Sequence, residues 1–128
     1  MRRRGIAAHV AVSCLAGIVW LAAESASAQQ IVRIVTFTVA SPEQQPQVLK
    51  VTDEITQVFK TSKAFRGITF AFNPETGENV AVSLWKSRAG MEDVAESAAF
   101  KPLLERMKLL TKSGLTVKTY QAYEPKKR

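Results

Sequence analysis

The sequence predicts a single α+β domain of the ferredoxin-like type, with element order βαββαβ, a four-stranded antiparallel sheet and two helices on one face. Three observations predict it. Segments rich in β-branched and aromatic residues open and close the domain, at residues 31–39 and 115–123. Two stretches with apolar residues at helical spacing lie between them. A run dense in turn formers, residues 73–79, separates two further strand-like segments and indicates a hairpin.

The first helix is predicted directly after the opening strand. Ser41-Pro42-Glu43-Gln44 has serine at the N-cap, proline at the first helical position and glutamine three residues after the serine, which predicts a capping box. Behind it, one apolar stripe recurs at helical spacing. Its members are Val48, Val51, Ile55, Val58 and Phe59. The pattern fades near Ser62, where we expect the helix to have ended.

The two middle strands are predicted on either side of the turn. Gly67 opens an alternating segment in which Ile68, Phe70 and Phe72 share one face. The return strand is predicted over residues 80–86, again rich in β-branched and aromatic residues.

A second helical stretch is predicted after Ser87, which suits an N-cap. Its first apolar stripe comprises Met91, Val94, Ala95 and Ala98. Pro102 marks a break or a restart, because proline inside a helix removes a backbone hydrogen bond. The stripe then continues with Leu103, Met107 and Leu110. Gly114 ends the helix, and residues 124–128 are expected to form a frayed basic tail after the last strand.

This topology leaves one face of the sheet without helices. Apolar residues nevertheless fall on both faces, since Val35 and Phe37 alternate with Ile34. Trp85 likewise alternates with Leu84. A bare and partly apolar sheet face favours packing against a second sheet. The sequence therefore predicts a homodimer.

The first 28 residues have the parts of a secretory signal peptide. Arg2–Arg4 give a positive start, residues 6–23 are mostly apolar, and Ala26-Ser27-Ala28 is a small-residue cleavage site. We expect cleavage after Ala28, a mature domain of residues 29–128 and a periplasmic or secreted location. A retained membrane anchor is the alternative, because the apolar run is near the lower length limit for a spanning helix.

Cleavage would remove the only histidine, His9, and the only cysteine, Cys14. Zinc sites, most haem sites and the Cys–His and Ser–His–Asp nucleophiles depend on these residue types, so we expect no metal and no cofactor. Removing the leader's three arginines and one glutamate from the 18 basic and 11 acidic residues leaves 15 and 10, a net charge of +5. Three of these bases are Lys126-Lys127-Arg128 and the others are scattered. We therefore expect no nucleic-acid partner, and no membrane partner after cleavage.

Three segments together resemble the antibiotic biosynthesis monooxygenase (ABM) family. They are Phe65-Arg66-Gly67-Ile68, Trp85-Lys86-Ser87 and Ser97-Ala98-Ala99-Phe100 before a leucine-rich helix. The resemblance runs from about Ile31 to Tyr123. It implies a dimeric α+β barrel in which each half encloses a small apolar pocket. It also implies an oxygenase that acts on aromatic or quinone-like substrates without metal or flavin. The haem-degrading relatives need a histidine on the second helix, so haem degradation is not expected here.

The resemblance makes Trp85 and Tyr120 the candidate catalytic residues. Trp85 matches the tryptophan that lines the family's pocket at the end of the third strand, although a strand tryptophan also suits core or interface packing. Tyr120 or Tyr123 would supply a phenol like that of some cofactor-free members. These two tyrosines point to opposite sides of the last strand, so only one of them enters a given cavity.

Four residues are candidates for substrate binding. Thr36 and Thr38 would donate hydrogen bonds into the pocket, although β-branching alone also places threonine in strands. Phe37 would belong to the apolar lining, although core packing is its first interpretation. Arg88 would bind an anionic ligand or stabilise an enolate, with a solvated arginine at a helix start as the alternative.

The predicted function is therefore an exported domain that binds a small aromatic or quinone-type ligand. One form of it is a cofactor-independent monooxygenase, in which a substrate with an easily lost proton is held as its anion in a dry pocket and reacts with dioxygen. The other is a non-catalytic, dimeric ligand-binding or structural module of the periplasm.

Overall fold

The computed structural model of this 128-residue chain describes residues 30–126. Its elements are β1 (Ile31–Thr38), the 3₁₀ turn η1 (Pro42–Gln44), α2 (Gln45–Phe59), β2 (Phe65–Phe72), β3 (Glu78–Trp85), α3 (Arg88–Ala95), α4 (Lys101–Leu109) and β4 (Thr116–Gln121). This order confirms the predicted βαββαβ arrangement, with the second helical stretch divided into α3 and α4. The predicted signal peptide and the end of the basic tail lie outside the described residues. No helix within residues 30–126 is long and apolar enough to cross a membrane.

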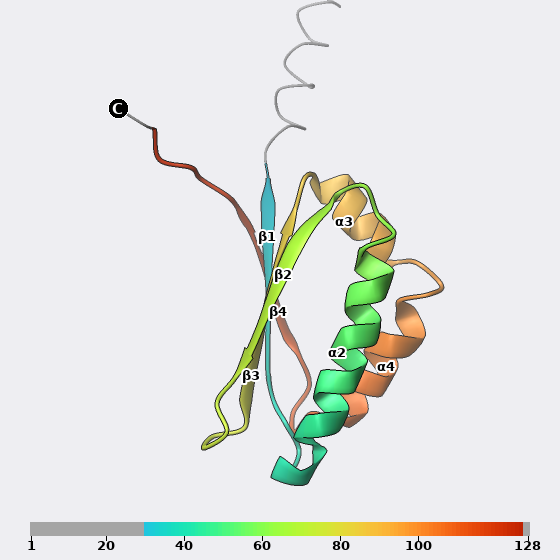
Figure 1. The fold of residues 1–128 in the computed structure, drawn as a ribbon, viewed down its shortest axis with the longest axis vertical. Coiled ribbons are helices and arrows are strands. Elements are labelled where there is room, and N and C mark those ends of the chain that lie inside the picture. The colour runs from blue at the N-terminus through green and yellow to red at the C-terminus, as the bar shows by residue number, and fades with distance from the viewer. Residues whose placement is uncertain (1–29, 127–128) are drawn as a thin grey trace, which may run out of the picture.

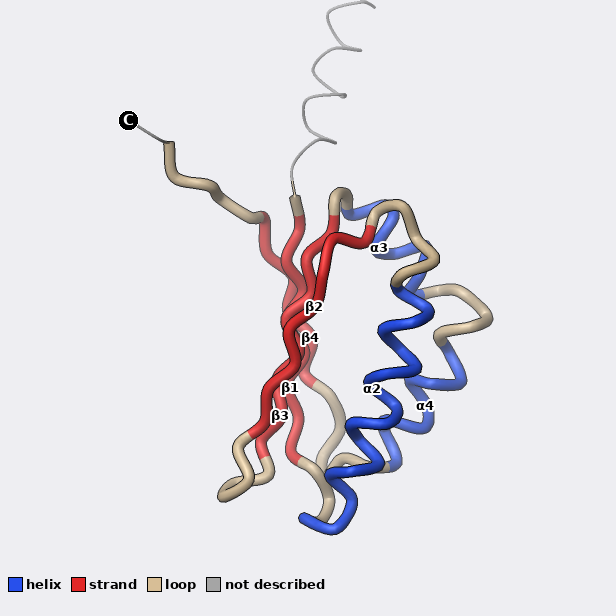
Figure 2. The backbone as a smooth tube through the Cα atoms, viewed as in Figure 1, coloured by secondary structure: helices blue, strands red, loops and turns tan. Residues whose placement is uncertain are grey.

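The four strands form one antiparallel sheet with the order β2-β3-β1-β4. β1 is central and pairs with both β3 and β4, so that Ile31 lies opposite Trp85 on one side and Gln121 on the other. The helices α2, α3 and α4 all lie on the same face of this sheet (Figures 1 and 2). The predicted fold class, a ferredoxin-like α+β domain with its helices on one face, is confirmed.

The register divides the strand side chains between two faces. Paired residues of an antiparallel sheet share a face, so the odd-numbered residues of β1, β3 and β4 lie together. Phe37 and Trp85 belong to this set and are buried, at 6% and 1% exposure. We call this side the covered face. The even-numbered residues of β1, β3 and β4 form the uncovered face, where Val82 and Tyr120 remain 37% and 47% exposed.

The start of the first helix differs from the predicted capping box. Ser41 has the extended backbone of an N-cap, but its side chain makes no capping hydrogen bond. Pro42 begins the turn η1, in which the Gln44 N–H donates to the Ser41 carbonyl at 3.0 Å. The Ser41 hydroxyl instead lies 3.4 Å from Gln44 Oε1. Because the backbone carbonyl already satisfies that N–H, the box does not form, and α2 begins only at Gln45.

The second helical stretch begins and breaks where the sequence predicts. Ser87 caps α3, since its Oγ accepts a hydrogen bond from the Gly90 N–H at 3.2 Å. The helix stops after Ala95, and the chain restarts as α4 with Pro102 in its first turn. The helix ends at Leu109, five residues before the predicted end at Gly114, which lies at φ 90° in the connection to β4. Proline supports such a restart because the first N–H groups of a helix have no partner within the helix.

The hairpin between β2 and β3 also follows the prediction, but both strands have other ends than predicted, since β3 spans Glu78–Trp85 instead of residues 80–86. β2 begins at Phe65, two residues before the predicted opening at Gly67, and contains an irregularity between these two residues. In the turn, the Asn73 side-chain oxygen accepts from the Glu75 N–H at 2.9 Å. Gly77 adopts φ 78°, a left-handed conformation that favours glycine.

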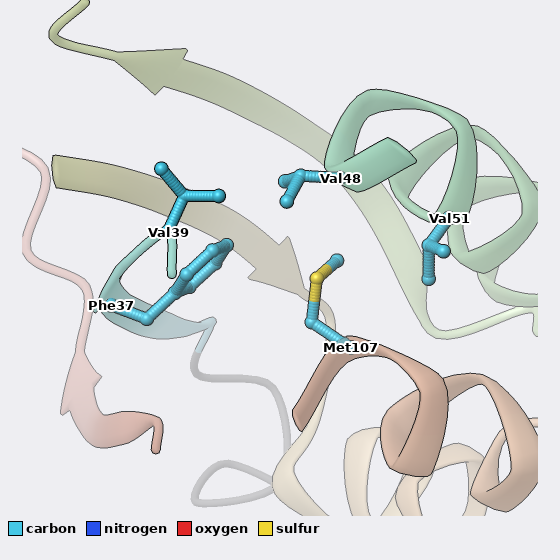
Figure 3. Packing of buried hydrophobic residues seen from close by; sticks show 5 residues of the cluster. All are labelled: Phe37, Val39, Val48, Val51 and Met107. Atoms are coloured by element: carbon cyan, nitrogen blue, oxygen red, sulfur yellow. The ribbon is translucent and has the colours of Figure 1, made fainter. Parts of the chain in front are cut away.

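Two groups of buried side chains hold the helices on the covered face. Figure 3 shows the first, in which residues of β1, α2 and α4 and the residue directly after β1 meet. Its members are Phe37, Val39, Val48, Val51 and Met107. The second group joins the other end of the sheet to α3, and its members are Ile31, Trp85, Met91 and Val94. The space between these two groups contains the candidate site.

Candidate functional site

A cavity of about 200 Å³ lies between the covered face of the sheet and the helices. Phe37 and Met107 line it from the first buried group, and Trp85 and Met91 line it from the second. Most of the other lining residues are apolar and come from the strands or from α2, α3 and α4. Such a cavity suits an apolar or aromatic molecule.

Aromatic rings form one wall of the cavity. Phe59 of α2 lies edge-on to Trp85, with ring centroids 4.9 Å apart, and Phe100 lies 5.7 Å from Phe59. Phe65 packs behind, at 5.3 Å from Trp85. The tilted geometry is the one that aromatic pairs prefer. These contacts hold Trp85 in place. Trp85 also lines the cavity, so the same side chain packs in the core and forms part of the pocket wall.

A chain of two hydrogen bonds fixes the indole against the sheet. Trp85 Nε1–H donates to the Ser83 hydroxyl at 2.9 Å, and that hydroxyl lies 3.4 Å from the Arg33 carbonyl, to which it donates. Ser83 is 5% exposed and lines the cavity. The hydrogen bond therefore gives the buried indole N–H an acceptor, and a buried N–H without an acceptor would lower the free energy of unfolding. It also links Trp85 on β3 to Arg33 on β1.

Thr52 is a further buried hydroxyl in the lining. It lies on α2 at 8% exposure, and its Oγ1 donates to the Val48 carbonyl one turn earlier at 2.8 Å. Threonine in a helix commonly satisfies its hydroxyl in this way. The two hydroxyls and the indole that line the cavity therefore donate their protons within the protein.

Arg33 is the charged residue of the lining, and the sequence analysis did not select it. It is half-buried on the covered face, and its Nε donates to Thr119 Oγ1 at 3.4 Å. Burial lowers the pKa of the Arg33 guanidinium; Glu92 opposes this shift and Arg88 adds to it. The sequence could have indicated Arg33, because it is the only charged residue in β1 and, like Phe37, has an odd number, which places both side chains on the same face of the strand.

The cavity reaches the edge of the sheet at β4. Val117 of β4 lines it and is nevertheless 49% exposed, because β4 is an edge strand. Thr119, which accepts the hydrogen bond from Arg33, lies two residues further along the same strand. Arg33 thus extends toward the side on which the cavity meets solvent.

The structure separates the two candidate catalytic residues. Trp85 lines the cavity, whereas Tyr120 pairs with Val32 and lies on the uncovered face. The sheet itself therefore stands between them within one chain, since neighbouring residues of a strand point to opposite sides. Tyr123 follows the end of β4 and is 79% exposed.

The candidate substrate-binding residues divide in the same way. Phe37 lines the cavity and also belongs to the buried core, so its substrate-binding role stays a prediction. Thr36 and Thr38 alternate with it and lie on the opposite side of β1, so neither donates a hydrogen bond into this cavity. Arg88 is exposed at the first position of α3 and does not line the cavity. Its effect on the site is electrostatic, since its positive charge lowers the pKa of Arg33.

Ligands for a metal do not gather in the described part of the chain. No group of three or more His, Cys, Asp or Glu side chains occurs there. Buried side-chain nitrogen and oxygen atoms in residues 30–126 all have hydrogen-bond partners.

A four-stranded antiparallel sheet with its helices on one face is the fold that this chain shares with structures of ABM proteins. The resemblance noted in the sequence is confirmed at the level of the fold, because ABM structures match this chain with TM-scores of about 0.66. No protein-family model and no curated protein matches the sequence itself.

SnoaB from Streptomyces nogalater, a cofactor-independent oxygenase, is one such structure. It is 15% identical, with a TM-score of 0.67, and the match covers 77% of this chain and 97% of SnoaB. A candidate antibiotic biosynthesis monooxygenase from Caulobacter crescentus is 17% identical, with a TM-score of 0.68 and coverage of 79% and 97%. Rv0793 from Mycobacterium tuberculosis is 14% identical, with a TM-score of 0.66 and coverage of 75% and 97%. At these identities the likeness defines the fold.

Proposed function

We propose that this chain is an exported domain that binds a small aromatic or quinone-type molecule in the cavity under its helices. The observation that carries the proposal is the cavity itself, with an aromatic wall around Trp85 and a single charged residue, Arg33. Apolar pockets with few polar groups are the usual form of small-molecule sites.

The cavity volume indicates how large a part of a ligand the cavity can enclose. An apolar cavity of about 150 Å³ binds benzene. The 200 Å³ here suits a molecule of one or two rings. Naphthol-like or naphthoquinone-like compounds are therefore better candidates than three-ring and four-ring polyketides.

We further propose that the bound molecule is oxygenated without a cofactor, as the description of SnoaB as a cofactor-independent oxygenase suggests by analogy. A dihydroxynaphthalene would lose the proton of one hydroxyl, and its anion would react with O₂ at a ring carbon. One oxygen atom becomes the new quinone carbonyl, and the other leaves as water with the two hydrogens that the substrate loses. The substrate supplies all four electrons, so no external reductant is needed. The chain would contribute a dry pocket and the charge of Arg33 beside the anion.

A non-catalytic binding module is the second candidate, and one observation favours it. Ser83, Thr52 and Trp85 direct their protons to other protein atoms, so the described cavity offers no hydroxyl–base pair to abstract a proton. In this alternative the same cavity holds the aromatic molecule without changing it.

Oxygen uptake separates these two candidates. The purified chain would be given 1,5-dihydroxynaphthalene, dioxygen and a chelator, with oxygen consumption and quinone absorbance recorded. Catalysis predicts uptake that survives chelation and falls about tenfold or more in Trp85→Phe, because the reacting ring is no longer positioned. Tyr123→Phe is a matched control at an exposed aromatic residue. Absence of turnover leaves only the binding module.

Binding itself is measured separately, by tryptophan fluorescence. Trp85 is the only tryptophan of the expected mature domain, residues 29–128. Saturable quenching of its fluorescence by 1,4-naphthoquinone is expected in that domain. Free N-acetyltryptophanamide in the same buffer reports collisional quenching alone and should show no saturable phase. Quenching of the domain that is as unsaturable as that of the free compound would contradict a site at Trp85.

We also propose a homodimer in which two uncovered faces pack together. Val82 and Tyr120 are partly exposed on this face, and Leu84 and Ile34 share it. A standard interface buries about 1,600 Å² in total, which is enough to stabilise a domain of this size. Because the folded form would be a dimer, the melting temperature of the unmodified chain should rise with protein concentration, and Val82→Lys should lower it. A well-folded monomer of the unmodified chain at micromolar concentration, seen by light scattering, would rule the dimer out.

A further inference from the structure

Arg33 places a positive charge in the lining of the cavity, and no described carboxylate pairs with it directly. It lies on the covered face of β1, between Ser83 of β3 and Thr119 of β4 in the sheet register. Phe37 of the same strand and face packs instead in the buried core against α2 and α4. The guanidinium is therefore held against a mostly apolar cavity.

The hydrogen-bonding capacity of Arg33 is largely unused. A guanidinium has five N–H donors. The described residues provide one side-chain acceptor, Thr119 Oγ1, at the long distance of 3.4 Å. The ion pairs between described residues are Arg106–Glu54 and Lys108–Glu105, so no described carboxylate lies within ion-pair distance of Arg33.

The other polar groups of the lining cannot donate to a ligand without losing an internal bond. The protons of Trp85, Ser83 and Thr52 are all directed to atoms of the protein. Arg33 is consequently the donor that the cavity offers, and it is a charged donor at the edge where the cavity meets solvent.

The charge around Arg33 also favours an anion. Arg88 and Glu92 of α3 are the charged groups that act on it through space. Together with Arg33 itself, these groups amount to two arginines and one glutamate, a net positive charge of one around the Arg33 guanidinium. Half-burial strengthens the attraction, because water screens it less than at a fully exposed site.

We infer that Arg33 makes this cavity selective for aromatic molecules that carry one acidic group, a carboxylate or an ionised phenol or enol. The ring lies against the wall of Trp85 and Phe59, and the acidic group meets the guanidinium at the β4 edge. A planar fork of N–H donors suits a carboxylate in particular. This inference rests on the proposed function, since it defines the substrate class of the same cavity.

Two ligands of similar shape test the charge. 2-Naphthoate is an anion and 2-acetylnaphthalene is its neutral analogue, and isothermal titration calorimetry of the full-length chain gives the affinity of each. We expect naphthoate to bind about tenfold more tightly or better, as one charge-assisted hydrogen bond would provide. This comparison needs no variant. Equal affinities, or tighter binding of the ketone, would overturn the inference and leave the proposed function standing.

Variants assign the preference to Arg33. Arg33→Gln should abolish the preference for naphthoate while the affinity for the ketone stays within about twofold, and Arg33→Lys should retain part of it. Arg88→Gln is the matched control, a nearby arginine that does not line the cavity, and should keep most of the preference. A preference that survives Arg33→Gln would overturn the assignment. Failure of the unmodified chain to bind either ligand would overturn the proposed function as well.

Discussion

Ser83→Ala is the change that tests most directly how the cavity holds its tryptophan. The Ser83 hydroxyl accepts the indole proton of Trp85 at 2.9 Å and lies 3.4 Å from the carbonyl of Arg33. Ser83 and Trp85 are 5% and 1% exposed, so bulk water does not replace the lost acceptor. The substitution removes one oxygen atom and leaves the indole N–H without its partner.

The cost follows from that stranded donor. A buried donor without a partner costs about 1–3 kcal/mol of the free energy of unfolding. For a domain of 60–100 residues each kcal/mol lowers the melting temperature by about 4–8 °C. We therefore expect Ser83→Ala to melt at least about 4 °C below the unmodified chain. The indole is also less firmly oriented, so ligand quenching of Trp85 should weaken.

A double-mutant cycle in urea isolates the interaction. Trp85→Phe removes the N–H, so Ser83→Ala in that background strands no donor and should cost about 1 kcal/mol less than it does alone. Ser113→Ala is a control at an exposed serine in the connection to β4 and should change stability by less than about 0.5 kcal/mol. The reasoning fails if Ser83→Ala is as mild as this control, or if its cost is the same with phenylalanine at position 85.

Three further outcomes are expected. Gly90→Ala should lower the free energy of unfolding by about 1–2 kcal/mol, although alanine favours helices, because the new Cβ would lie 2.2 Å from the Ala64 Cβ. Ala64→Gly should restore the stability of that variant. A urea titration in which Gly90→Ala alone is more stable than the unmodified chain would refute the contact. Tyr120→Phe should leave naphthoquinone binding within about twofold, since Tyr120 lies on the uncovered face, and a large loss would contradict that placement. Hydrogen bonds from Arg106 lower the pKa of the Glu54 carboxyl, so this pair stabilises the folded chain at neutral pH and the contribution is lost as pH falls through that lowered pKa. Glu54→Gln should therefore cost stability at neutral pH but not in strong acid, and a cost that is independent of pH would count against the pair.

Local features of the fold were predictable because their causes lie within a few residues. Ser87 caps a helix whose N–H groups are only three positions away, and Pro102 restarts a helix at the position where its missing N–H is harmless. The position of each strand along the chain was likewise predictable from the local alternation of apolar and polar residues. The box at Ser41 failed for an equally local reason, since a short 3₁₀ turn satisfied the Gln44 N–H through the backbone.

The candidate site was predictable only in part. Trp85 and Phe37 were found from the sequence, and both line the cavity. Tyr120, Thr36 and Thr38 were grouped with them, but the register places these three on the other side of the sheet.

The sequence by itself determined which elements form and which residues of a strand share a face, because both follow from backbone geometry over a few residues. Only the tertiary structure decided which face the helices cover and which residues of different strands become neighbours. Arg33, Ser83 and Trp85 lie 52 positions apart at most, and the pairing of β1 with β3 joins them through two hydrogen bonds. A polar group becomes part of a site when strand pairing and helix packing enclose it, and those contacts join segments that are distant in the chain.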